Sequence, residues 1–427
     1  MNMPEYHAKW YKLDNAAKVF PAVANLKRTY MFRVGAVLKE DIDKDVLQQA
    51  LVDVVKRFPS FNVRIRKGLF WYYFETNHKN PIVLEEDPFI GKYLVFKDNN
   101  DFLFRTLYYG KRLSFEMFHS ITDGTGALEF LKAILFQYLK LKGKSVTSDG
   151  MILTSEMEIL KEEEQDSFLK NYDKNVKVNR KEPKAYHLKG TNYDEFWQGI
   201  IHGILDVDDL KVLAKEKNVT ITEYLCGVLT YCIYVTELKH VKTKRAFRFF
   251  LPVNLRRFFD SKTLRNFALF VRTTQYLSGK ELSFEEILEE SATQIRAGLS
   301  KDKLLAALSS NVKFEKNIFL RITPLFIKIF ALRIGYKLLG EDVNSFAMSN
   351  LGVIDLPESM KNEINRFEFS IGASQICKKN AAIATYNNQL VISFSTLAIE
   401  RALEREFFRF LSSRGVKVII ETNELEV

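Results

Sequence analysis

The sequence is poor in cysteine, with Cys226, Cys232 and Cys377 as the three among 427 residues. Their odd number argues against a disulfide framework, and their spacing is not that of zinc ligands. Cys226 and Cys232 lie in an apolar stretch, where unreactive, packed thiols are expected. The first residues also lack the apolar segment of a secretory signal. We therefore predict a protein of the reducing cytoplasm.

Several signatures of catalysis and binding are missing. The sequence has no Gly-x-Ser-x-Gly elbow, no Gly-x-x-x-x-Gly-Lys-Ser/Thr phosphate loop and no His-Glu-x-x-His motif. We expect no metal and no permanently bound cofactor. The net charge of +10 comes from dispersed residues, without a basic block interleaved with aromatics. This pattern argues against a nucleic-acid partner.

Long hydrophobic runs free of charge are also missing. The most apolar segment, residues 318–339, carries Arg321, Lys328, Arg333 and Lys337, which would be costly at the centre of a bilayer. Its apolar residues nevertheless cluster on one side of a helical wheel. We favour a core helix here, with a weak membrane-surface contact through 318–339 as the alternative.

The length predicts two large domains, because single cores rarely exceed about 250–300 residues. We expect an N-terminal half at 1–150, a crossover at 151–192 and a C-terminal half at 193–427. The charged run 161–166 is typical of an exposed part of such a crossover.

Both halves mix strand-like and helix-like patterns, which predicts an α/β fold with mixed (α+β) sheets. In the first half, apolar spacing indicates a helix over 41–57 and alternation indicates a strand over 112–118. A flexible turn is expected at 124–126, followed by a helix to about Lys140. In the second half we expect strands at 199–207, 246–253, 346–349, 367–372, 382–386 and 390–395, and helices at 208–217, 222–238, 283–299 and 400–412.

The string His119-Ser-Ile-Thr-Asp123-Gly124 joins the predicted strand to the following helix. A neutral imidazole at a strand end suits a general base, although a partly buried histidine packed on Phe115 and Phe118 is the structural alternative. Asp123 is expected to cap the helix or to form an ion pair that fixes the loop, with a distant arginine as its partner.

Four segments in order resemble the chloramphenicol acetyltransferase-like superfamily, which includes alcohol acetyltransferases, polyketide-associated acyltransferases, BAHD acyltransferases and condensation domains. They are His119 to Gly124, Arg57-Phe58-Pro59, Pro252 to Arg256 with Asn266-Phe267 after it, and Ser349-Asn350-Leu351-Gly352. The resemblance covers nearly the whole chain. It implies two similar domains with the active site in a channel at their interface.

The resemblance implies that His119 deprotonates an acyl acceptor, that Asp123 pairs with Arg256, and that Gly124 shapes the loop. Ser349 and Asn350 would supply an oxyanion donor or border the donor channel, unless they form an ordinary strand-end turn. The expected reaction moves an acyl group from acyl-CoA, a co-substrate, to a small-molecule alcohol or amine, and we expect a monomer.

Two alternatives stay open. A condensation-like enzyme would use a separate acyl carrier protein, although condensation domains usually carry two consecutive histidines and Phe118 precedes His119 here. A non-catalytic binding protein of the same fold is the other.

Overall fold

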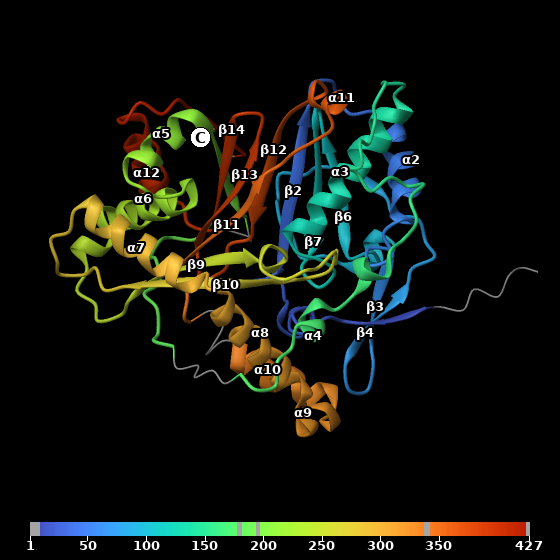
Figure 1. Ribbon diagram of the computed structural model, residues 1–427, viewed down its shortest axis with the longest axis horizontal. Coiled ribbons are helices and arrows are strands. Elements are labelled where there is room, and N and C mark those ends of the chain that lie inside the picture. Colours follow the sequence, from blue (N-terminus) through green and yellow to red (C-terminus); the bar gives the residue numbers. More distant parts are fainter. Residues whose placement is uncertain (1–8, 177–181, 194–196, 337–341, 424–427) are drawn as a thin grey trace, which may run out of the picture.

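The computed structural model describes residues 9–176, 182–193, 197–336 and 342–423. Figure 1 shows two halves side by side, each built on a sheet with helices packed against its outer face. The five-stranded sheet of the first half has the order β12-β2-β7-β6-β5, and the seven-stranded sheet of the second has the order β10-β9-β11-β13-β14-β8-β15. A small sheet, β1-β4-β3, lies in the first half.

The first half and the crossover contain β1 Trp10–Lys12, α1 Phe20–Val23, β2 Met31–Leu38, α2 Lys44–Val55, β3 Val63–Lys67, β4 Tyr72–Thr76, β5 Val83–Glu85, η1 Phe96–Asn99, β6 Phe104–Tyr109, β7 Arg112–Phe118, α3 Gly124–Leu141, η2 Lys161–Glu164 and α4 Ser167–Lys170. The second half contains β8 Gly199–Asp206, α5 Val207–Glu216, α6 Ile221–Thr236, η3 Leu238–His240, β9 Phe247–Asn254, η4 Leu255–Arg257, β10 Ala268–Gln275, α7 Phe284–Gly298, α8 Lys301–Lys316, α9 Ile318–Ile322, α10 Leu325–Tyr336, β11 Phe346–Val353, α11 Glu358–Lys361, β12 Ile364–Ile371, β13 Lys379–Tyr386, β14 Gln389–Thr396, α12 Ala402–Ser412 and β15 Val418–Thr422. The mixed α/β class is confirmed.

Helix α3 organises the core of the first half. Its apolar side is buried between the five-stranded sheet and α2, and Phe130 stacks on Phe61 and meets Phe58 edge-on. Each buried phenylalanine contributes about 1.5–3 kcal/mol by leaving water. The predicted helix 41–57 is α2, which begins later because the Asp43 side chain caps it by accepting from the backbone N–H groups of Asp45 and Val46.

Helix α6 has the corresponding central place in the second half, where α7 and α12 pack against it. Ser283 and Glu286 form the predicted capping box at the start of α7. Cys226 and Cys232 are buried in α6, and burial raises the pKa of both thiols. Packed, protonated thiols of this kind are poor nucleophiles.

One strand of the C-terminal stretch belongs to the sheet of the first half. Strand β12 pairs antiparallel with β2, with Phe367 opposite Ala36. The chain then returns through β13 to the seven-stranded sheet. The division of the sequence at 151–192 stays a prediction, but the two sheets do not follow it strictly, because 364–371 completes the first sheet.

The acidic run 161–166 was expected to be solvated, and this is wrong for Glu163. Its carboxylate is buried and accepts two hydrogen bonds from Arg57, at 2.7 and 2.8 Å. Bidentate geometry is the arrangement in which a buried arginine and carboxylate best offset their lost hydration. The crossover is therefore anchored on the first half.

The expectation of a core helix over 318–339 is also wrong. The segment breaks at Thr323-Pro324 into α9 and α10, because proline cannot continue a helix, and residues 337–339 lie outside the described part. Its large apolar side chains, including Phe319 and Phe326, are exposed. No single helix among the described residues is long and apolar enough to span a membrane, while the bent pair 207–216 and 221–240 passes by length and composition.

Candidate active site

His119 follows directly on β7 in a loop held by backbone contacts. Its N–H donates to the carbonyl of Tyr30 at 3.0 Å, and the Ser120 hydroxyl donates to the carbonyl of Ala17 at 3.3 Å. The loop ends at Asp123, where α3 begins. The imidazole therefore lies at the end of β7, the central strand of the first sheet.

The ring of His119 is enclosed by aromatic side chains. Phe20, from α1, stacks on it with centroids 4.6 Å apart, and Phe32 meets it edge-on at 5.1 Å. Desolvation in this setting lowers the pKa of His119, and the nearby Asp123 charge and the hydrogen bond to Asn266 only partly oppose that effect. The imidazole is consequently neutral at pH 7, as a general base must be.

A hydrogen bond from the second half determines which ring nitrogen carries the proton. His119 Nδ1 lies 3.0 Å from Asn266 Oδ1. The amide of Asn266 is oriented because its Nδ2 donates to Asp14 Oδ2 at 3.3 Å. Asp14 is itself buried and accepts from the N–H of Ala17 at 2.8 Å. This network assigns the proton to Nδ1, so Nε2 keeps the lone pair.

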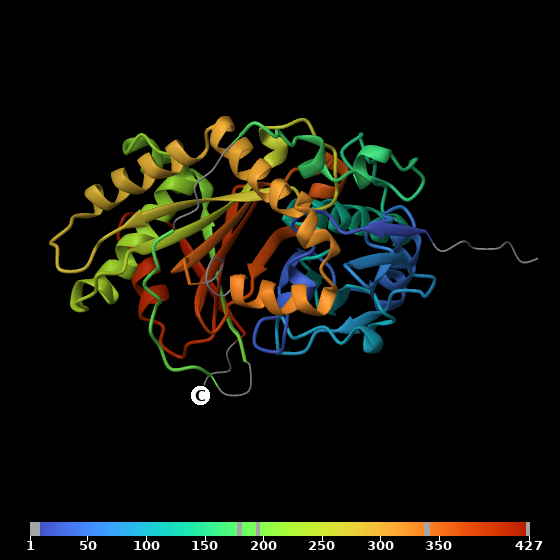
Figure 2. The ribbon, with the colours of Figure 1, turned by 90° about the horizontal axis from the view of Figure 1, so that it is seen from below.

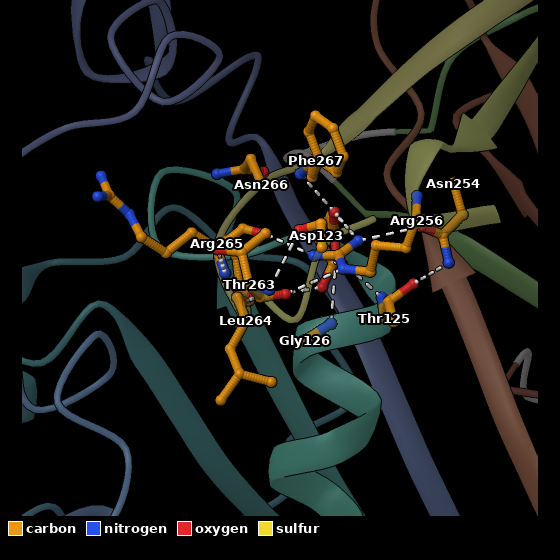
Figure 3. A network of polar contacts seen from close by, with 12 residues as sticks. Asp123, Thr125, Gly126, Asn254, Arg256, Thr263, Leu264, Arg265, Asn266 and Phe267 are labelled. Carbon is orange, nitrogen blue, oxygen red and sulfur yellow. Dashed lines mark hydrogen bonds and ion pairs between the residues drawn. The ribbon is translucent and has the colours of Figure 1, made fainter. Parts of the chain in front are cut away.

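Asp123 accepts from four donors, which use both of its carboxylate oxygens (Figure 3). Oδ1 accepts from the N–H groups of Thr125 and Gly126, at 3.1 and 3.2 Å, as the cap of α3. Oδ2 accepts from Arg256 Nη1 and from the N–H of Phe267, both at 2.8 Å. Asp123 therefore has both expected roles, as the cap of α3 and as the partner of an arginine.

Arg256 is held in place on every side of its guanidinium. Its Nε donates to the carbonyl of Thr263 at 2.9 Å and its Nη2 to the carbonyl of Arg265 at 2.6 Å (Figure 3). The side chains of Arg256 and Asp123 are both largely buried. This ion pair ties the loop that carries His119 to the segment 254–267 of the second half.

The expected flexible turn at 124–126 is wrong, because Gly124 and Gly126 form the first turn of α3. Close packing explains the glycines. A Cβ on Gly126 would lie 2.1 Å from the carbonyl oxygen of Leu264, and one on Gly124 would lie 2.7 Å from Leu351 Cδ2. Both clashes involve the second half, so the glycines let the two halves approach.

Ser349 and Asn350 lie on β11, close to the loop through Leu351. The Asn350 amide donates to Thr222 Oγ1 at 3.0 Å and accepts from the N–H of Gly352 at 2.7 Å. The first bond joins β11 to the start of α6, and the second lies within β11, where the pairing with β13 shifts register between Asn350 and Val353. Within residues 9–176, 182–193, 197–336 and 342–423, no hydrogen bond joins either side chain to His119, and the Ser349 hydroxyl has no side-chain partner.

A cavity of about 100 Å³ lies between the two sheets, away from His119. Its walls carry ionisable side chains such as Arg33, Arg112, Glu368 and His202. Arg112 donates to Glu368 at 2.8 Å, and although burial opposes it, the charges of His202 and Arg112 lower the pKa of Glu368 to about 2. The pair of Arg112 and Glu368 lies within the first sheet, and His202 of β8, whose Nε2 is 3.8 Å from Glu368 Oε2, reaches it from the second sheet. In the part of the chain that the structure describes, no cluster of three or more His, Cys, Asp or Glu can hold a metal ion.

Sequence reasoning missed two residues of the site and the role of a third. Asn266 itself belongs to the segments that carry the resemblance, but nothing in the sequence pointed to its bond with His119. Asp14 and Phe20 lie about 100 residues before His119 in segments without a motif. Only the folded structure, which brings Asp14 and Phe20 close to His119, identifies them as residues of the site.

No family model and no curated protein matches the sequence. Solved structures do match. The trichothecene 15-O-acetyltransferase TRI3 from Fusarium sporotrichioides is 12% identical, with 97% of this chain and 96% of that chain covered and a TM-score of 0.59. TRI101 from F. graminearum, complexed with coenzyme A and T-2 mycotoxin, is 10% identical over 98% of this chain and 100% of that chain, with a TM-score of 0.63.

The condensation domain of the Monacolin K polyketide synthase MokA is 12% identical, with 95% and 96% covered and a TM-score of 0.56. At these identities the likeness concerns the fold alone. The chain has the two-domain fold of chloramphenicol acetyltransferase-like acyltransferases over nearly its full length.

Proposed function

We propose that this protein is an acyltransferase that moves an acyl group from acyl-CoA to an alcohol, with His119 as the general base. The bond between His119 Nδ1 and Asn266 Oδ1 carries the proposal, because it leaves Nε2 unprotonated and ready to accept a proton. The fold, shared with a structure complexed with coenzyme A and a mycotoxin, supports it.

The reaction needs no covalent enzyme intermediate. Nε2 of His119 takes the proton of the acceptor hydroxyl while the oxygen attacks the thioester carbon. The C–S bond of the tetrahedral intermediate then breaks, and the thiolate takes the proton back from Nε2. Ser349 remains our candidate donor to the oxyanion, since the amide of Asn350 is already engaged.

Asp123, Gly124 and Arg256 have a positioning role in this proposal. They hold the His119 loop against the second half and do not touch the reacting atoms. An effective base must keep its geometry, because a displacement of about 1 Å can cost about a hundredfold in rate.

The test combines binding and turnover. Acyl-CoAs of different chain lengths are screened for thermal stabilisation, and thiol release is then measured against alcohols and amines. His119→Ala should lower turnover by about 10²–10⁴ while the protein stays folded. His240→Ala, which removes an exposed histidine of η3, is the matched control and should keep full turnover. Unchanged turnover in His119→Ala would contradict the mechanism.

The likeness to the MokA condensation domain favours one second candidate, in which the donor is a carrier-bound thioester. The chemistry at His119 is the same in that case. If CoA thioesters neither stabilise the protein nor react, while an acyl group on a separate carrier protein is transferred, this second candidate replaces the first.

A further inference from the structure

Helices α9 and α10 and the end of α8 turn their largest apolar side chains outward. Among the described residues, the four phenylalanines that are more than 60% exposed all lie between 314 and 330, and Phe319 and Phe326 reach 75% and 73%. We call the following residues the outer face: Phe314, Ile318, Phe319, Ile322, Phe326, Ile327, Phe330 and Ile334. An apolar cluster of this extent is unusual on a soluble protein and marks an interaction surface.

The orientation of α10 is enforced by specific contacts on its inner side. Lys328 is only 3% exposed, its Nζ donates to the carbonyl of Phe70 at 2.9 Å, and it lies 3.7 Å above the ring of Trp71. Arg333 Nε donates to the carbonyl of Ala22 at 2.9 Å. Polar groups thus face the protein while phenylalanines face outward, which is the reverse of an ordinary surface helix.

Positive charge surrounds the outer face. Residues 301–336 contain seven Lys or Arg and two acidic residues, so this segment holds +5 of the net charge of +10. Lys313, Lys316 and Arg321 are exposed next to the phenylalanines. The acidic residue nearest to them, Glu315, is paired with Lys18 and Asn15 of the first half. The electrostatic partner of this surface is therefore an anion-rich one.

Figure 1 shows α8, α9 and α10 projecting at the lower edge of the molecule, beside the hairpin of β3 and β4, and Figure 2, seen from below, shows these orange helices in front of the body. The N–H of Leu325 donates to the carbonyl of Leu69 at 2.8 Å, which joins α10 to the hairpin tip. Leu69 is itself 73% exposed. The hairpin tip thus adds another exposed apolar residue beside the outer face.

We infer that the outer face docks on the surface of an anionic lipid bilayer. Exposed phenylalanines and isoleucines enter the boundary between headgroups and acyl chains, and the surrounding Lys and Arg are attracted by anionic headgroups. Helices of 5 and 12 residues lie along such an interface, since a span needs about 20. A second copy of the chain fits less well, because both copies would bring the same positive charge.

Sedimentation with vesicles tests this docking on the full chain. Phosphatidylcholine vesicles are compared with vesicles that also contain about a third phosphatidylglycerol. The wild type should bind the anionic vesicles, and binding should weaken as salt is added. Each buried phenylalanine is worth about a factor of ten in partitioning, so F319S/F326S/F330S should lose binding about a thousandfold. K313S/K316S/R321S should lose it on anionic vesicles.

The matched control removes three exposed apolar residues elsewhere, V212S/Y276S/I420S, and should bind as the wild type does. Melting curves show that each variant is folded. Failure of the wild type to bind anionic vesicles would overturn the inference, as would equal loss in the control. Light scattering tests self-association as the alternative. If the wild type is a dimer that does not bind vesicles, and F319S/F326S/F330S is a monomer, the outer face is a dimer interface.

Discussion

Replacement of Asp123 by asparagine changes one oxygen of a buried carboxylate to an amide nitrogen. The wild-type carboxylate accepts from Arg256 Nη1, the N–H of Phe267 and the N–H groups of Thr125 and Gly126. Asparagine has one acceptor oxygen, so two of the four donors lose their acceptor in either orientation of the amide. The guanidinium of Arg256 also loses its counter-charge while it stays buried.

We expect Asp123→Asn to lower the free energy of unfolding by about 3–5 kcal/mol, the usual cost of breaking a buried ion pair by removing one partner. In a chain of this size the Tm should fall by on the order of 5 °C. Turnover should fall as well, because the loop that carries His119 loses its link to the second half. Calorimetry and thiol release measure the two effects.

A double-mutant cycle with Arg256→Met isolates the pair. If the pair acts as the geometry indicates, the double variant should be less destabilised than the sum of the single variants, with a coupling on the order of 2 kcal/mol. Glu281→Gln, which breaks an exposed pair with Lys239, is the control and should leave the Tm unchanged. Additive effects of the two active-site substitutions would refute the reasoning.

Three further predictions follow from single groups. Because desolvation lowers the pKa of His119 below 6.5, the acid limb of kcat/KM should have its midpoint below pH 6.5, and a midpoint above 7 would contradict His119 as the base. Burial, and secondly the negative charge of Asp14, raise the pKa of Asp166 from 3.8 to about 6 in the folded protein. The protonated carboxyl therefore contributes to the free energy of unfolding, and this contribution is fully present below about pH 4 and is lost as the pH rises through 6. Asp166→Asn, which keeps the helix cap, should therefore have a higher Tm than the wild type at pH 7.5 and an equal one at pH 4; equal values at both would contradict this. Gly126→Ala should lower the Tm although alanine favours helices, because its Cβ would meet a backbone oxygen at 2.1 Å, whereas Gly335→Ala, with open space around it, should not; equal melting temperatures would refute the packing argument.

Local patterns were sufficient for many elements. Helix α2 and the capping box of α7 depend on residues within a few positions of each other, which a sequence displays directly. The strand that leads to His119 is equally local. The resemblance added Arg256, which no local pattern would have connected with Asp123 across 133 positions.

Other features depend on contacts that local patterns do not contain. The burial of Glu163 requires Arg57, and the rigid first turn of α3 requires Leu264 and Leu351 at close range. The orientation of α10 also depends on long-range contacts, because the hydrophobicity of this segment predicted a buried helix. Its phenylalanines are exposed because Lys328 and Arg333 bind the body of the protein from the other side.

The sequence by itself determined the class of fold, the strand, loop and helix around His119, and the candidate base, because periodicity, capping and the motif are properties of neighbouring residues. Tertiary structure decided which nitrogen of His119 is free, since Asn266 and Asp14 are 252 positions apart in the sequence and meet only in the folded protein. It also decided that the apolar segment 318–336 faces outward. A helix has two sides, and only packing against the rest of the molecule selects the one that is buried.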